Sequence, residues 1–107
     1  MDTQMKKGLL DAYVLAIVNK DETYGYKIVQ EANNAISLTE STLYPILRRL
    51  EKQVLLETHT EEYNSRLRKY YRITGEGKAK LHLYKEQWKD IKLIMDEIFK
   101  MGEGETA

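Results

Sequence analysis

Basic side chains are concentrated in two short segments in the middle of the sequence. They are Arg48, Arg49 and Lys52 in the first segment, and Arg66, Arg68, Lys69 and Arg72 in the second. Such clusters can bind phosphate oxygens along a nucleic-acid backbone. The alternative is an ordinary solvated surface. Net charge does not decide between the two, because 17 basic residues balance 17 acidic ones.

Other kinds of site chemistry have few candidates. The chain has no cysteine, which excludes disulfides, thiolate metal sites and cysteine nucleophiles. His59 and His82 stand alone, without a spaced carboxylate or cysteine to complete a metal site. Gly75-Glu76-Gly77 lacks the length and the lysine of a phosphate-binding loop. We therefore expect no enzyme activity, no metal and no cofactor.

Length and composition indicate one small globular protein. The 107 residues are 42% hydrophobic and 32% charged, which is typical of a chain that buries a single core. The apolar stretch from Leu9 to Val18 is interrupted by Asp11 and is too short to cross a bilayer. We expect a buried helix there. We also expect no contact with membranes and, since cysteine is absent, a cytoplasmic location.

The first basic segment lies on a predicted helix from Thr39 to about Lys52. Thr39 is a suitable N-cap, and Leu38 and Leu43 occupy the two positions of a hydrophobic staple. The inward stripe has helical spacing and contains Leu43, Ile46, Leu47 and Leu50. The opposite face carries Ser41, Tyr44, Pro45, Arg48 and Lys52. Pro45 costs a backbone hydrogen bond, which marks either a working surface or an irregular helix start.

The second basic segment lies on a predicted hairpin. Its strands are Leu55–Thr60 and Leu67–Thr74, with a turn at Asn64-Ser65. Two further helices are predicted upstream, over Met5–Asn19 and over Tyr24–Asn33, the second with Thr23 as its N-cap. Three helices followed by a hairpin is the order of a winged helix-turn-helix, whose third helix enters the major groove of DNA. The predicted fold class is mainly α with a small β-hairpin.

A long helix is predicted after Thr74, another suitable cap. We assign residues 1–74 to the DNA-binding domain, 75–101 to a dimerisation helix and 102–107 to a disordered tail. Apolar residues of this helix recur at intervals of three and four, the spacing of a helix-pairing seam. Together with two first-helix residues, they make the predicted dimer interface: Leu9, Tyr13, Leu81, Tyr84, Trp88, Ile91, Met95 and Ile98. Pairing would place two basic faces about one duplex turn apart.

Three motifs then occur together in order: Tyr24-Gly25-Tyr26, the run from Ser41 to Lys52, and the run from Arg68 to Gly77. In this respect the sequence closely resembles the PadR family of bacterial transcriptional regulators, and its short C-terminus resembles the smaller subfamily with a single C-terminal helix. The resemblance implies a homodimer that represses by occupying a palindromic double-stranded operator and is released by a small-molecule effector. The alternative is a winged helix that binds protein instead of DNA.

The resemblance also implies roles for individual residues. The set expected at DNA is Tyr26, Lys27, Thr39, Ser41, Thr42, Tyr44, Pro45, Arg48, Arg66, Arg68 and Lys69. The hairpin, which forms the wing, departs from the family pattern, because Asn64-Ser65 stands where many relatives have a glycine pair. Gln53-Val54 likewise replaces a common Asp-Gly. The sequence therefore leaves the conformation of the wing open.

Trp88 is the only tryptophan and lies near the middle of the predicted seam. In a symmetric dimer, two such indoles can meet across the axis. By resemblance to drug-sensing relatives, Trp88, Leu10 and Val14 are expected to bind a flat aromatic effector. The alternative is that Trp88 fills the dimer core and binds no ligand.

Overall fold

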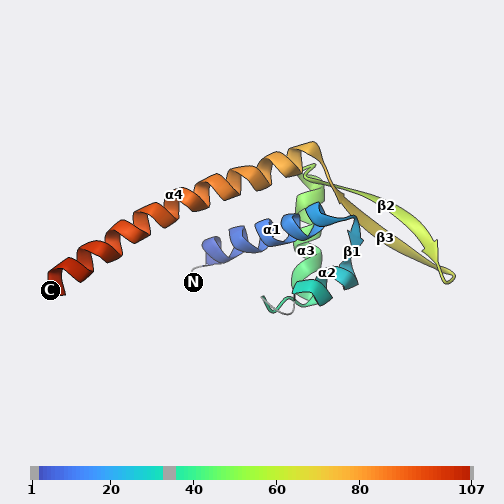
Figure 1. Ribbon diagram of the computed structural model, residues 1–107. Helices are drawn as coiled ribbons and strands as arrows, with labels where there is room; N and C mark the ends of the chain where they lie inside the picture. Colours follow the sequence, from blue (N-terminus) through green and yellow to red (C-terminus); the bar gives the residue numbers. More distant parts are fainter. Residues whose placement is uncertain (1–2, 33–35, 107) are drawn as a thin grey trace.

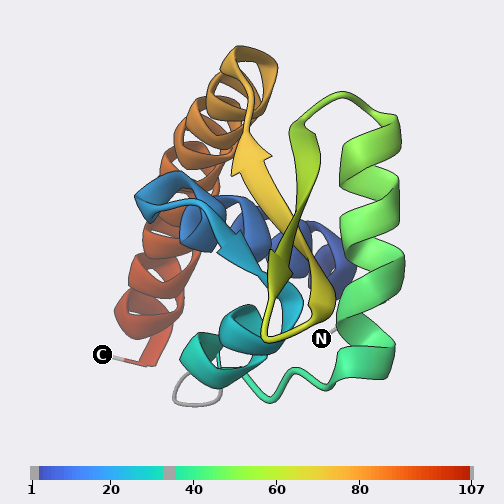
Figure 2. The ribbon, with the colours of Figure 1, turned by 90° about the vertical axis from the view of Figure 1, so that its right-hand side faces the viewer.

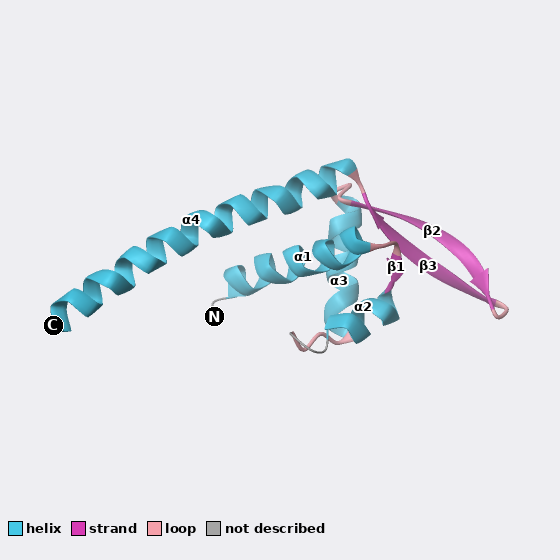
Figure 3. Ribbon diagram, viewed as in Figure 1, coloured by secondary structure: helices cyan, strands magenta, loops and turns pink. Residues whose placement is uncertain are grey.

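The computed structural model describes the backbone of residues 3–32 and 36–106, and it has the predicted fold class (Figure 1). In chain order the elements are α1 (Thr3–Lys20), β1 (Thr23–Tyr24), α2 (Gly25–Ala32), α3 (Glu40–Lys52), β2 (Leu56–Tyr63), β3 (Arg66–Ile73) and α4 (Gly75–Thr106). Figure 3 shows three helices gathered beside a small sheet, with the fourth helix reaching away from them. The predicted end of the second helix, Asn33, lies outside the described residues.

The core lies where α1, α2, α3 and the base of the sheet meet. The predicted inward stripe of α3 is confirmed, since Leu43, Ile46, Leu47 and Leu50 are all buried. An ion pair between Asp11 and Arg49 joins α1 to α3 at the edge of this core. Arg49, one of the basic residues noted in the sequence, therefore holds the fold together.

The sheet has the strand order β1-β3-β2, and all of its pairings are antiparallel. The Asn64-Ser65 turn is confirmed: both residues have positive φ, 50° and 63°, as in the two-residue turns that match strand twist. The strands run closer to this turn than predicted, so that Glu61 and Glu62 belong to β2. We call the β2–β3 hairpin the wing.

The prediction that Thr23 caps the second helix is wrong. Thr23 pairs with Tyr71 in the sheet, is 3% exposed, and α2 begins only at Gly25. A capping hydroxyl would accept a hydrogen bond from a backbone amide of the helix. The Thr23 hydroxyl has no hydrogen-bond partner within the described residues. The sequence pattern missed β1 because two residues carry no detectable periodicity.

The junctions at both ends of the wing are made by backbone contacts. After α3, the Leu55 amide donates to the Leu50 carbonyl and the Val54 amide to the Glu51 carbonyl, which together form a Schellman motif. This motif puts Val54 at φ 62°, where glycine is usual. At the other end, Thr74 caps α4 as predicted, because its hydroxyl accepts from the Gly77 amide at 2.9 Å.

The α4 helix projects from the body and gives the molecule its longest dimension of 67 Å (Figure 1). It continues to Thr106, so the predicted end of the helix at residue 101 is wrong. Ala107 lies outside the described residues. The exposed apolar residues of α4 include Trp88, Ile91, Met95 and Ile98.

Candidate nucleic-acid interface

A groove of about 720 Å³ lies between α3 and the wing. The base of the wing contacts α3 at Glu51, near the C-terminal end of the helix, and the tip extends away from it (Figure 1 and Figure 2). We call this space the helix–wing groove. It is lined by Tyr24, Gly25, Tyr26, Tyr44, Arg48, Tyr63, Asn64, Arg66, Leu67, Arg68, Lys69 and Tyr71. Tyrosine rings and cations side by side can contact both the sugars and the phosphates of a nucleic acid.

The predicted residues divide into two groups. Six of them line the groove: Tyr26, Tyr44, Arg48, Arg66, Arg68 and Lys69. The other five, Lys27, Thr39, Ser41, Thr42 and Pro45, do not line it. Of these five only Lys27 is partly buried, and the rest are exposed around the N-terminal half of α3. Tyr24, Tyr63 and Leu67 also line the groove, and no sequence pattern had indicated them. Strand register places Tyr63 opposite Arg66, on the face that Arg68 shares, whereas Leu67 is on the other face.

The start of α3 is held by its own hydroxyl groups. Thr39 is the N-cap, as predicted, and its side chain accepts from the Thr42 amide. The Ser41 and Thr42 hydroxyl oxygens lie 3.0 Å and 3.1 Å from the Thr39 hydroxyl oxygen. These exposed hydroxyls surround the positive end of the helix, where anions are favoured.

Tyr44 and Arg48 lie one helical turn apart on the outward face of α3. Tyr44 is 39% exposed, and its ring rests against Gly25 at the start of α2. Arg48 is exposed and, within residues 3–32 and 36–102, has no carboxylate at ion-pair distance. Its charge is therefore available to a ligand in the groove.

The wing is attached to α3 through Glu51. One carboxylate oxygen accepts from Lys69 at 3.1 Å, and the other accepts from the Thr58 hydroxyl at 3.0 Å. Lys69 is thus partly neutralised within the protein. Arg66, near the tip of the wing, is exposed and lacks such a partner in the part of the chain whose side chains are described.

Arg68 is in contact with aromatic rings. Its guanidinium carbon lies 4.1 Å from the centre of the Tyr24 ring and 4.3 Å from the centre of the Tyr63 ring. A hydrogen bond with the Tyr70 side chain raises the pKa of Arg68 further above its ordinary value. The residue is therefore a permanent cation held between β1 and the end of β2.

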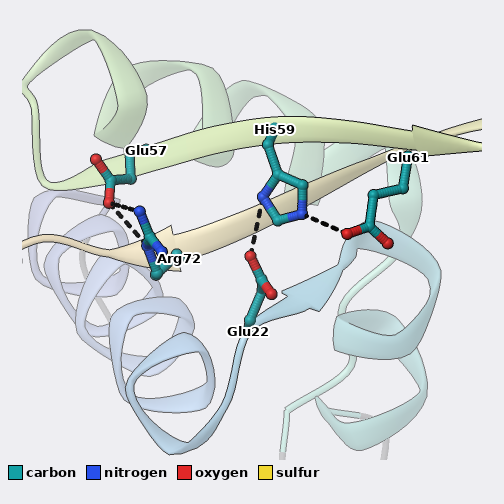
Figure 4. A network of polar contacts seen from close by, with 5 residues as sticks. All are labelled: Glu22, Glu57, His59, Glu61 and Arg72. Carbon is teal, nitrogen blue, oxygen red and sulfur yellow. Dashed lines mark hydrogen bonds and ion pairs between the residues drawn. The ribbon is translucent and has the colours of Figure 1, made fainter.

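A chain of polar contacts crosses the sheet near the base of the wing (Figure 4). The Nδ1 and Nε2 atoms of His59 lie 2.9 Å from Glu22 and 3.1 Å from Glu61, and the imidazole stacks on the Tyr70 ring. The expectation that His59 stands alone is therefore wrong, because strand pairing and the turn before β1 bring carboxylates to it. Farther along, Arg72 donates to Glu57 at 2.8 Å.

A second groove, of about 790 Å³, lies between α1 and α4. We call it the α1–α4 groove. Leu9, Tyr13, Leu81, Tyr84, Trp88 and Ile91 from the predicted dimer seam line it, and Trp88 is 50% exposed. Val14, also expected at the effector, is fully buried in the core and does not line this groove. Leu10 packs partly buried against the core and is also outside this lining.

Two kinds of feature are absent from the described residues. No helix among them is both long enough and apolar enough for a membrane span. They also contain no group of three histidine or acidic side chains that could hold a metal ion.

Comparison with known proteins gives consistent results. The profile of the family described as "Transcriptional regulator PadR-like family" matches residues 14–83. An uncharacterized protein of Lysinibacillus sphaericus is 38% identical over 95 residues, which cover 84% of this chain and 87% of that protein.

Solved structures of PadR-like regulators have a similar fold. A PadR-like transcription factor from Bacteroides fragilis superposes with a TM-score of 0.82 at 33% identity, covering 90% of this chain and 95% of the other. Bacillus subtilis PadR, solved in complex with operator DNA, has a TM-score of 0.67 and 26% identity. That match covers 71% of this chain and 46% of that protein.

Proposed function

The chain belongs to the PadR-like family of transcriptional regulators, and on that premise we propose that it binds operator DNA in the helix–wing groove and represses transcription as a homodimer. The observation that carries the proposal is the pair Arg48 and Arg66. Both cations line one groove and neither has an acidic partner among the described side chains. Phosphate or a base edge would supply the missing partner.

The parts of the groove have distinct proposed roles. The outward face of α3 enters the major groove, where Arg48 donates to a guanine edge or a phosphate and Tyr44 packs on the sugar–base surface. Ser41 and Thr42 bind phosphate at the start of α3, and Tyr26 and Lys27 bind phosphate from the start of α2. Arg66 and Lys69 follow the neighbouring backbone from the wing. The relative solved with operator DNA supports this arrangement, since its fold resembles the present one.

The homodimer is proposed from α4. Ile91, Met95 and Ile98 are 39%, 44% and 56% exposed along one stripe of the helix. An apolar stripe of this length is costly to leave in water. A second copy would cover it and would present two α3 helices to successive major grooves, about 34 Å apart.

Release by an effector is proposed from the α1–α4 groove. The α1–α4 groove is apolar and has Trp88 exposed within it, so a flat aromatic compound could stack there. In the alternative, Trp88 only fills the dimer core. Quenching of tryptophan fluorescence by planar aromatic compounds, together with release of DNA, supports the effector, and unchanged fluorescence across a varied panel contradicts it.

The experiment that tests DNA binding is a map of the chromosomal sites that the protein occupies in its own cell. The protein should bind a duplex taken from the strongest site at least about a thousandfold more tightly than it binds an unrelated duplex. Derepression of the adjacent gene on deletion of the regulator would support repression. No enriched site and equal affinity for both duplexes would favour a winged helix that binds protein.

A further inference from the structure

The tip of the wing receives little support from the rest of the sheet. β1 pairs with β3 only at Tyr70 and Tyr71, whereas β2 and β3 continue together as far as Tyr63 and Arg66. Figure 1 shows the resulting hairpin extending beyond the helices. A two-stranded ribbon is marginally stable alone in water. Side-chain contacts must therefore keep the tip at a fixed angle to α3.

Arg68 connects the tip of the wing to the body of the protein. The guanidinium lies over Tyr24, which belongs to the body, and over Tyr63, which belongs to the tip. Tyr24 is itself fixed by an edge-on contact with Tyr70, at 5.6 Å between ring centres. One cation thus links the last residue of β2 to the strand that precedes α2.

This geometry favours Arg66 over Arg68 as the phosphate ligand of the wing. Both rings lie within cation–π distance of the guanidinium, and drawing the group away from them toward a phosphate would give up both contacts. Arg66 lies two residues nearer the tip, is exposed, and makes no ion pair or ring contact among the described residues. It can contact DNA without losing anything inside the protein.

We propose that Arg68 is a positioning residue that holds the wing at its DNA-binding angle through Tyr24 and Tyr63, and that Arg66 is the arginine by which the wing contacts the DNA backbone. The second half of this proposal rests on the proposed function. The first half concerns the free protein and can be tested without DNA.

The first test is hydrogen exchange of backbone amides in the free protein. Because each ring contact contributes a modest stabilisation, Arg68→Ala should speed exchange at residues 61–68 by roughly five- to thirtyfold. Tyr63→Leu should have a similar effect, and Tyr63→Phe, which keeps the ring, should not. Arg72→Ala is the matched control, since Arg72 lies on the same face of β3 but pairs with Glu57. Should Arg68→Ala fold poorly, Arg68→Lys, which keeps the charge, should give an intermediate rate.

The second test uses the operator duplex and varies the salt concentration. Removal of a phosphate contact lowers the slope of log affinity against log salt by about 0.9. Arg66→Ala should show this loss once for each subunit of the dimer. Arg68→Ala should weaken binding with its slope unchanged, and the double variant Arg68→Ala, Tyr63→Leu should bind no more weakly than the worse single variant.

The outcomes separate the possibilities. If Arg68→Ala leaves exchange unchanged, Arg68 does not position the wing and the proposal is overturned. If Arg68→Ala loses about 0.9 of salt slope for each subunit while Tyr63→Leu binds normally, Arg68 is a phosphate ligand and the proposal is likewise overturned. If the unaltered protein binds no operator, the proposed function fails. The exchange rates would still decide the role of Arg68 in that case.

Discussion

Gly25 and the Tyr44 ring are in direct contact: a Cβ atom at position 25 would lie 2.7 Å from the Tyr44 hydroxyl oxygen. The absence of a side chain at the start of α2 therefore lets the exposed tyrosine of α3 lie against the body. This contact links two of the sequence motifs that first indicated the family. It also sets the position of a ring that lines the helix–wing groove.

Gly25→Ala should displace Tyr44 and weaken operator binding by about tenfold, the loss expected from one misplaced contact. The ring can swing toward solvent, so the melting temperature should change little. Fluorescence anisotropy with the operator duplex measures the first effect and circular dichroism the second. Gly75→Ala is the control, because no atom lies within 4 Å of a Cβ at that position. Equal affinities for both variants would contradict the proposed role of Tyr44.

Val54→Gly should stabilise the fold by about 1 kcal/mol, because a β-branched residue at φ 62° is strained and glycine is not. The gain is limited by the greater freedom of glycine in the unfolded chain. Urea unfolding measures the difference. Val54→Ala retains a Cβ and should fall between the two. A glycine variant less stable than the valine protein would show that packing of the exposed valine outweighs the backbone strain.

Tyr71 should make the fold sensitive to alkaline pH. Burial raises the pKa of Tyr71 above its ordinary value of 10.0, so the folded state favours the neutral phenol. The unfolded chain releases this proton first. The resulting stability is fully present below about pH 10 and is lost as pH rises through the folded-state pKa. Urea unfolding at a series of pH values measures the free energy of unfolding. Above about pH 10 this free energy should fall less steeply for Tyr71→Phe than for the protein without substitutions. Identical slopes would contradict the assignment.

Replacing both Ile91 and Met95 by lysine should give monomers, because pairing would then bury unpaired charges in the proposed seam. Light scattering at increasing concentration measures the mass. Lys89→Ala with Lys92→Ala changes the charge of the same helix without adding charge to the stripe, and this variant should remain dimeric. A chain without substitutions that stays monomeric at high concentration would contradict the homodimer.

Much of the fold was predictable because it depends on local chemistry. Thr39 and Thr74 cap the helices assigned to them, and Asn64-Ser65 makes the expected turn. What failed depends on residues far apart in sequence. Thr23 pairs with a strand residue 48 positions later, His59 meets Glu22, and Arg68 meets Tyr24, and none of these contacts follows from periodicity or spacing.

In the candidate site, too, the features set by local sequence were predictable and the contacts between distant residues were not. Tyr44 and Arg48 could be placed on the outward face of α3 by counting helical turns from the cap. The difference between Arg66 and Arg68 could not be predicted, since both are basic and lie on the same strand face. Only the pairing of three strands brings two rings to Arg68 and leaves Arg66 without one.

The central claim is that Arg48 and Arg66 of the helix–wing groove bind operator DNA, and the salt dependence of operator affinity tests it most directly. Without substitutions, the logarithm of the affinity should fall steeply with the logarithm of the salt concentration. The double variant Arg48→Ala, Arg66→Ala should lose about 1.8 of that slope for each subunit, because each lost phosphate contact removes about 0.9. Should Arg48 contact a base instead, the loss should be about 0.9 with altered sequence preference. A double variant with unchanged slope and unchanged preference would contradict the account.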